Sequence, residues 1–167
     1  MEIRVRATGA AMQEQEFRAY QQANGGPTWD RTTDEVLEAL GADVVFEGPQ
    51  ATTTPPYEFS YRNGVEQIDG KWYTKYSVGP VFTDRPATET EPAMTAAEQM
   101  AAYKAQKDAE QATSIRTQRT QKLADCDWTQ IADSTADKAA WATYRQALRD
   151  ITAQPGFPWT IDWPVAP

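Results

Sequence analysis

Proline limits what this chain can fold into more than any other residue type does. The 167 residues include 11 prolines, most of them between residues 49 and 92 or between 155 and 167. Because proline lacks a backbone N–H and has a fixed φ, it interrupts helices and inner strands. Hydrophobic residues make up 40% of the chain, and many of them are alanines, which bury little area. We therefore expect a small core with long extended segments, and a fold that association completes.

Residues 1–83 indicate a small α+β module. Polar and apolar residues alternate over the first few positions, as in a half-buried strand, and Thr32 and Glu35 form a capping box before a short helix. Asp69 and Gly70 favour the tight turn of a β-hairpin. The predicted strands are 2–6, 43–46, 57–61 and 71–78, the predicted helices are 11–23 and 33–40, and residues 49–56 are a stiff proline-rich loop.

Residues 84–94 are a predicted linker, and residues 95–167 a predicted helical hairpin with an extended tail rich in aromatic residues and proline. Thr95 and Glu98 form a second capping box, which starts a long polar helix that runs to about residue 123. Its apolar positions are sparse and no heptad repeat is sustained, so this helix needs support from its length, its ion pairs or a partner. The chain as a whole is predicted to be of the α+β class.

The second helix of the hairpin, residues 135–152, has a clear apolar stripe. The residues of this stripe recur at steps of three and four, and they are Trp141, Tyr144, Leu148 and Ile151. The predicted contacts between the two helices involve Ile115, Leu123, Tyr144, Leu148 and Ile151. Trp128 and Ile131 in the connecting loop are of usually buried types, so we expect Trp128 to be wedged at the turn.

The residue types argue against catalysis. The chain has no histidine, which removes the usual general base, the commonest metal ligand and every Ser–His or Cys–His pair. No glycine-rich phosphate-binding loop occurs, and Cys126 is expected to be a buried thiol in a reducing compartment. Asp125, Asp127 and Asp133 lack the spacing of a calcium loop, so we interpret them as solvated or capping carboxylates. Residue types alone leave a carboxylate-only glycosidase open, but no pair stands out, and we expect a non-enzyme without cofactor or metal.

The formal net charge of −8 narrows the choice of partners. Nucleic acids and anionic membranes are poor partners for such a chain, because it lacks the basic surface that phosphate contacts require. No basic segment followed by an apolar run opens the chain, and no window approaches the ~20 apolar residues of a membrane span. We therefore expect a soluble protein that is made in the cytoplasm.

Several motifs in the last third of the chain resemble those of phage tail fibre assembly proteins, also called tail fibre chaperones. They are Arg116-x-x-Arg119-x-x-x-Leu123, Asp127-Trp-Thr-Gln130, the Trp-Ala-Thr-Tyr-Arg-Gln-Ala-Leu-Arg run of 141–149, Pro155-Gly-Phe-Pro158 and Trp163-Pro164. Leu37-x-x-Leu40-Gly41 and Asp69-Gly-Lys-Trp72 are similar to a small module that often precedes that region. The chain departs from the pattern at Leu123-Ala124, where a leucine pair is common, and at Cys126, where threonine is common.

The resemblance implies a binding protein that assists folding, trimerisation or attachment of a bacteriophage tail fibre. Its partner would be the fibre protein, which is trimeric in that family's systems. It would act in the host cytoplasm during assembly, and some members of the family remain in the virion tail. One alternative is a permanent structural component of the tail, such as a fibre adaptor or a baseplate-associated protein. Another alternative is a carbohydrate-binding or hydrolysing protein at a fibre tip.

Tryptophan and arginine are the side chains most often found as interface hot spots, and they supply the candidate partner-binding residues. These are Trp128, Arg145, Arg149, Trp159 and Trp163. In the extended tail we expect Phe157 and Trp159 to fold back against Trp141 and Tyr144. We expect Trp163 to lie beyond the hairpin with nothing of its own chain to touch, which would make it the best candidate for a partner contact.

Overall fold

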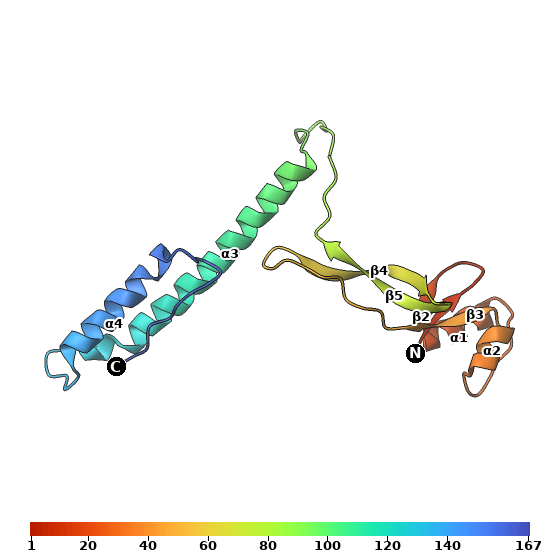
Figure 1. The fold of residues 1–167 in the computed structure, drawn as a ribbon, viewed down its shortest axis with the longest axis horizontal. Helices are drawn as coiled ribbons and strands as arrows, with labels where there is room; N and C mark the ends of the chain where they lie inside the picture. Colours follow the sequence, from red (N-terminus) through yellow and green to blue (C-terminus); the bar gives the residue numbers. More distant parts are fainter. The chain divides into compact units, whose positions relative to one another are not determined.

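The computed structural model describes residues 1–167, and the chain divides into two compact units, Met1–Val81 and Phe82–Pro167 (Figure 1). The first unit contains all the strands and two short helices. The second contains a long helix, a shorter helix and an extended tail. The predicted α+β class is therefore confirmed. No helix combines the length and the apolar character that a membrane span requires.

The first unit is built on a five-stranded sheet with the order β2-β1-β3-β5-β4. All neighbouring strands are antiparallel except β3 and β5, which pair in parallel. The strands are β1 (Glu2–Val5), β2 (Ala11–Gln13), β3 (Ala42–Phe46), β4 (Phe59–Ile68) and β5 (Lys71–Gly79).

The core of the first unit lies on one side of strands β1 and β3, under helices α1 (Glu14–Ala23) and α2 (Asp34–Ala39). Alternation along β1 directs Ile3 and Val5 to the same face, and Val5 pairs with Ala42 of β3. Phe17 of α1 and Leu37 of α2 complete this cluster, and both are almost fully buried. The helices are amphipathic, and their apolar stripes cover half of the sheet.

Two boundaries in this unit differ from the predictions. The predicted helix 11–23 begins only at Glu14, because residues 11–13 form strand β2 against β1. The side chain of Thr33 caps α2, not that of Thr32. The Thr32 hydroxyl instead donates to Glu14 at 2.6 Å and accepts from the Trp29 indole at 2.8 Å, which fastens the loop before α2 to helix α1.

The hairpin of β4 and β5 has the predicted turn but longer strands. Asp69 and Gly70 both have positive φ, 48° and 78°, as a tight primed turn requires. Strand β4 starts at Phe59, two residues later than predicted, and continues through Ile68. A bulge interrupts its pairing between Arg62 and Val65, where Gly64 adopts a φ of 88°.

In the second unit, residues 84–94, the predicted linker, are a loop in which Arg85 and Met94 form an isolated antiparallel bridge. Helix α3 (Ala96–Asp125) follows, and its capping box of Thr95 and Glu98 is as predicted. After the 3₁₀ turn η1 (Asp127–Gln130) come helix α4 (Lys138–Asp150) and a second 3₁₀ turn, η2 (Ile151–Ala153). Asp137 caps α4 through Ala139 and Ala140, so α4 begins at Lys138, three residues later than predicted.

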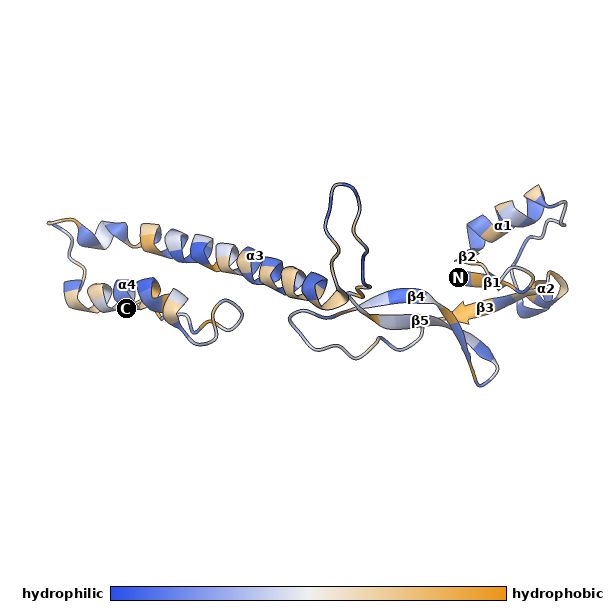
Figure 2. Ribbon diagram, turned by 90° about the horizontal axis from the view of Figure 1, so that it is seen from above, coloured by the Kyte–Doolittle hydropathy of each residue, from blue (hydrophilic) through white to orange (hydrophobic).

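Helix α4 lies beside the second half of α3, and the tail after residue 154 returns along the pair (Figure 1). Ile115, Leu148 and Ile151 form the buried centre of this packing. Partly buried residues surround it, namely Leu123, Tyr144, Phe157, Ile161 and Trp163. Figure 2 shows hydrophilic and hydrophobic residues mixed along α3, so that helix relies on α4 and the tail for its burial.

Candidate partner-binding surface of the C-terminal unit

The turn between α3 and α4 is held by the side chain of Arg145. Its Nη1 donates to the carbonyl of Leu123 at 2.9 Å and contacts the Cys126 sulfur at 3.0 Å, and its Nη2 pairs with Asp127 at 2.8 Å. The carbonyls in the last turn of a helix have no partner within the helix. From its position on α4, Arg145 therefore provides a hydrogen-bond donor to the carboxyl end of α3. It also holds the start of η1 in place.

Arg145 has a structural role in this turn, and its place among the candidate partner-binding residues stays a prediction. It is only 9% exposed and packs inside the turn. Burial lowers the pKa of Arg145, but the hydrogen bonds to Asp127 and Cys126 raise it more, so the net shift is upward and the guanidinium remains charged. Cys126 is buried beside it, as predicted for a lone thiol.

Three aromatic rings stack along the outside of the same turn. Trp128 of η1 meets Trp141 of α4 edge to face, with 5.8 Å between ring centroids. Trp141 in turn meets Tyr144 at 5.5 Å and an interplanar angle of 88°. Edge-to-face pairs of this kind stabilise both rings beyond their burial. The pKa of the Tyr144 hydroxyl is raised, first by burial and then by the charges of Cys126 and Asp125.

Trp128 and Ile131 are the most exposed apolar side chains of this region, at 53% and 55%. The prediction that both are buried, with Trp128 wedged at the turn, is therefore wrong. Trp128 in η1 and Ile131 directly after it both present apolar surface to solvent, and Trp128 packs on Trp141, which meets Tyr144. We call these four residues the turn surface.

Carboxylates flank the turn surface. Residues 123–137 contain four aspartates and no lysine or arginine. Asp127 pairs with Arg145 yet keeps 65% of its side chain exposed, and the Asp137 carboxylate caps α4. The Lys138 ammonium lies on this loop as well, where it donates to the carbonyl of Ala132 at 3.2 Å. The turn surface is therefore apolar at its centre and acidic at its margin.

The tail corrects two further expectations. Trp163 does contact its own chain, because it packs against the core of Ile115, Leu148 and Ile151, and the Lys122 ammonium lies 5.3 Å from its ring centroid. Trp159 donates its indole N–H to Asp108 of α3 at 2.6 Å. It therefore lies on the long helix, not against the rings of α4 as predicted, and it is 37% exposed.

The structure brings only some of the five candidate residues together. Trp128 and Arg145 meet at the turn, on the outside and the inside respectively. Arg149 is on the exposed side of α4, one turn beyond Arg145. Ile131 was missed as a candidate because sequence periodicity assigns an isoleucine to the core by default. Its position two residues before the polar stretch Asp133-Ser-Thr135 is a signal that it lies at the edge of the fold.

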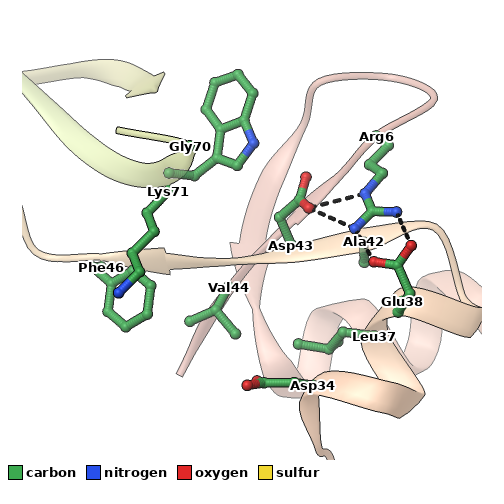
Figure 3. Close-up of a pocket in the computed structure, with 11 residues that line it drawn as sticks. Arg6, Asp34, Leu37, Glu38, Ala42, Asp43, Val44, Phe46, Gly70 and Lys71 are labelled. Atoms are coloured by element: carbon green, nitrogen blue, oxygen red, sulfur yellow. Dashed lines mark hydrogen bonds and ion pairs between the residues drawn. The ribbon is translucent and has the colours of Figure 1, made fainter. Parts of the chain in front are cut away.

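A pocket of about 200 Å³ lies in the first unit, between α2, β3 and the β4–β5 turn (Figure 3). Three of its charged side chains bind one another. Arg6 donates to Asp43 at 2.9 Å and to Glu38 at 3.0 Å. The hydrogen bond from Arg6 lowers the pKa of Glu38. These groups are mutually satisfied, and no group of three or more acidic or thiol side chains is placed to hold a metal ion.

Residues 112–167 match the family model described as phage tail assembly chaperone protein. This range contains the second half of α3, the turn surface, α4 and the tail. No curated protein and no solved structure matches the chain. Over this last third the chain is similar to the phage tail assembly chaperone family, which confirms the resemblance to phage tail chaperones that the motifs indicate.

Proposed function

We propose that this protein assists the folding, trimerisation or attachment of a bacteriophage tail fibre, and that it does so by binding and not by catalysis. The observation that carries the proposal is the match of residues 112–167 to a tail assembly chaperone model. That match supports a role in tail assembly. The fibre as the particular client rests on the motifs of the second unit, above all the Trp-x-x-Tyr-Arg helix of residues 141–145.

The geometry of the second unit suits a binding role. A chaperone needs an apolar surface that does not collapse into its own core, and exposed apolar patches on soluble proteins mark such contacts. Trp128 is kept outside because Arg145 fills the inside of the turn and holds η1 by three contacts. The surface is thus formed before a partner arrives, which lowers the ordering cost of association.

The place and duration of the interaction are part of the proposal. The protein would bind the fibre polypeptide in the host cytoplasm, before or during trimer formation. It would either leave after assembly or remain in the virion tail. Nucleic acid is a poor partner because the net charge is −8, which repels phosphate.

Co-expression with the fibre protein of the same phage tests the proposal. We expect the two proteins to co-elute in size-exclusion chromatography, and the yield of soluble fibre trimer to fall when the chaperone is omitted. A tail protein other than the fibre, expressed in the same way, is the control. Co-elution with that control instead of the fibre would transfer the role to another part of the tail. Failure to bind either would remove the proposed function.

A further inference from the structure

We propose that the turn surface is a docking site for a basic, apolar segment of the partner polypeptide. The inference rests on the proposed function, because it specifies the chemistry of the segment that the chaperone binds. It does not depend on the partner's being the fibre. Three observations support it: the exposure of Trp128 and Ile131, the way the chain covers its other aromatic rings, and the excess of carboxylates around the turn.

The first observation concerns apolar area. Trp128 in η1 and Ile131 directly after it expose more than half of their surfaces. The Trp141 ring supports Trp128 at a centroid spacing of 5.8 Å, and Tyr144 supports Trp141 at 5.5 Å. A tryptophan that is held in place by its neighbours and still faces solvent offers large contact area at little entropic cost. This combination is typical of interface hot spots.

The second observation is that arginine or lysine covers several other aromatic rings of this chain. In the first unit Arg4 lies 3.8 Å from the Trp72 centroid and Arg18 lies 4.7 Å from that of Trp29. In the second unit the corresponding pairs are Arg116 with Phe157 and Lys122 with Trp163. The Trp128 ring has an aromatic neighbour in that position, Trp141, and keeps its outer part in solvent. A cation of the partner would find there an aromatic face suited to it.

The third observation is electrostatic. Four aspartates lie between residues 123 and 137, against three cations: the buried Arg145, Lys138, and Lys122 in the last turn of α3, whose ammonium lies near the Trp163 ring. Within a distance comparable to the Debye length of about 8 Å at physiological salt, exposed carboxylates attract a basic segment and repel an acidic one. The apolar centre supplies affinity, and the acidic margin selects the charge of the segment.

Two amphipathic helical peptides of equal length and apolar content, one with lysines and one with glutamates on the polar face, test the inference with the full chain. We expect the lysine peptide to bind at least about tenfold more tightly, with an affinity that falls as salt is raised. Trp128→Ala should weaken its binding at least about tenfold. Val165→Ala is the matched control, because Val165 is 90% exposed and lies outside the turn, and it should leave binding unchanged.

A second pair of variants tests the charge. Asp133→Asn with Asp137→Asn removes two charges at the turn, and asparagine can still cap α4. Glu89→Gln with Glu91→Gln removes two charges from the loop before α3 as the control. We expect only the aspartate variant to weaken binding of the lysine peptide, by several-fold. Equal binding of the two peptides, or full binding by Trp128→Ala, would overturn the docking site.

The same variants separate this inference from the proposed function. If the fibre co-elutes with wild type and with Trp128→Ala to the same extent, the docking site is wrong while the chaperone role stands. If the lysine peptide depends on Trp128 and the aspartates but the fibre does not bind, the docking site stands and the fibre is not the client. Circular dichroism of each variant verifies that a loss of binding is not a loss of fold.

Discussion

The tail and the turn of the second unit both carry tryptophan, but they use it in opposite ways. The tail packs Trp163 against the hairpin core, with the Lys122 ammonium near its ring. The turn keeps Trp128 outside with 53% of its surface exposed. The difference follows from what lies beside each ring, which is the apolar hairpin core at the tail and the polar contacts of Arg145 at the turn.

This contrast shows that a tryptophan beside proline in an extended segment is poor evidence of a partner surface. Extended backbone can follow a groove as easily as it can leave the fold, and the apolar groove of a two-helix hairpin needs a cover. An apolar residue that a short loop cannot bury is the stronger candidate for a partner contact. The predictions below test whether the tail tryptophan stabilises the fold while the turn tryptophan binds a partner. A residue of the hairpin core, on which both depend, is the reference.

The largest effect is expected for Leu148→Ala. Leu148 is fully buried at the centre of the hairpin packing, and such truncations remove apolar contacts and leave a cavity. We expect the free energy of unfolding to fall by about 2–5 kcal/mol in urea titrations. Thr143→Ala on the exposed side of α4 is the control. An equally stable Leu148→Ala protein would show that the tail does not depend on the hairpin core.

The next effect is expected for Arg145→Met. This change keeps the length of the side chain but removes all three contacts at the turn, and it leaves the Asp127 carboxylate without its ion pair. We expect a loss of about 2–3 kcal/mol in the free energy of unfolding. Arg149→Met is the matched control, since Arg149 is exposed on the same helix, and it should change stability by less than about 0.5 kcal/mol. Similar losses in both variants would argue against a clamp at the turn.

The sequence predicts the main helices and turns of each unit, because these elements depend on local signals. The Thr95 and Glu98 capping box, the Asp69-Gly70 turn and the stripe of α4 each act within a few residues, and each is present in the structure. Strand β2 was mistaken for helix because three residues carry too short a period to distinguish the two, and its pairing with β1 decides the matter.

The candidate surface is harder to predict, because the exposure of a side chain depends on which spaces the side chains of other elements already occupy. Arg145 and Arg149 lie four residues apart on one helix and look equivalent in sequence. Only the structure distinguishes them, because Arg145 donates a hydrogen bond to the end of α3. Trp128 and Ile131 have side chains that usually enter a core, and only the filled turn keeps them outside. Sequence periodicity carries no information on either point, since both are set by contacts between α3 and α4.

A smaller effect is expected for Trp163→Ala, and it compares the tail with the turn directly. The ring is partly buried against the hairpin core, and Lys122 lies over it. We expect a loss of about 1–2 kcal/mol in the free energy of unfolding, below the 3–5 kcal/mol typical of a fully buried tryptophan. Thermal denaturation together with size-exclusion of the fibre complex checks this. Unchanged stability with lost fibre binding would return Trp163 to the partner surface.

The smallest effect on stability is expected for Trp128→Ala, which should lower the free energy of unfolding by less than about 1 kcal/mol. The ring is more than half exposed, and its main contact is the edge-to-face pair with Trp141, which is itself supported by Tyr144. Because Arg145 holds η1 from the inside, the backbone of the turn should keep its conformation without the indole. Urea titration followed by far-ultraviolet circular dichroism measures the change independently of tryptophan fluorescence. A loss larger than that of Trp163→Ala would mean that Trp128 belongs to the core of the hairpin, and the distinction between a covering tail and a binding turn would then be wrong.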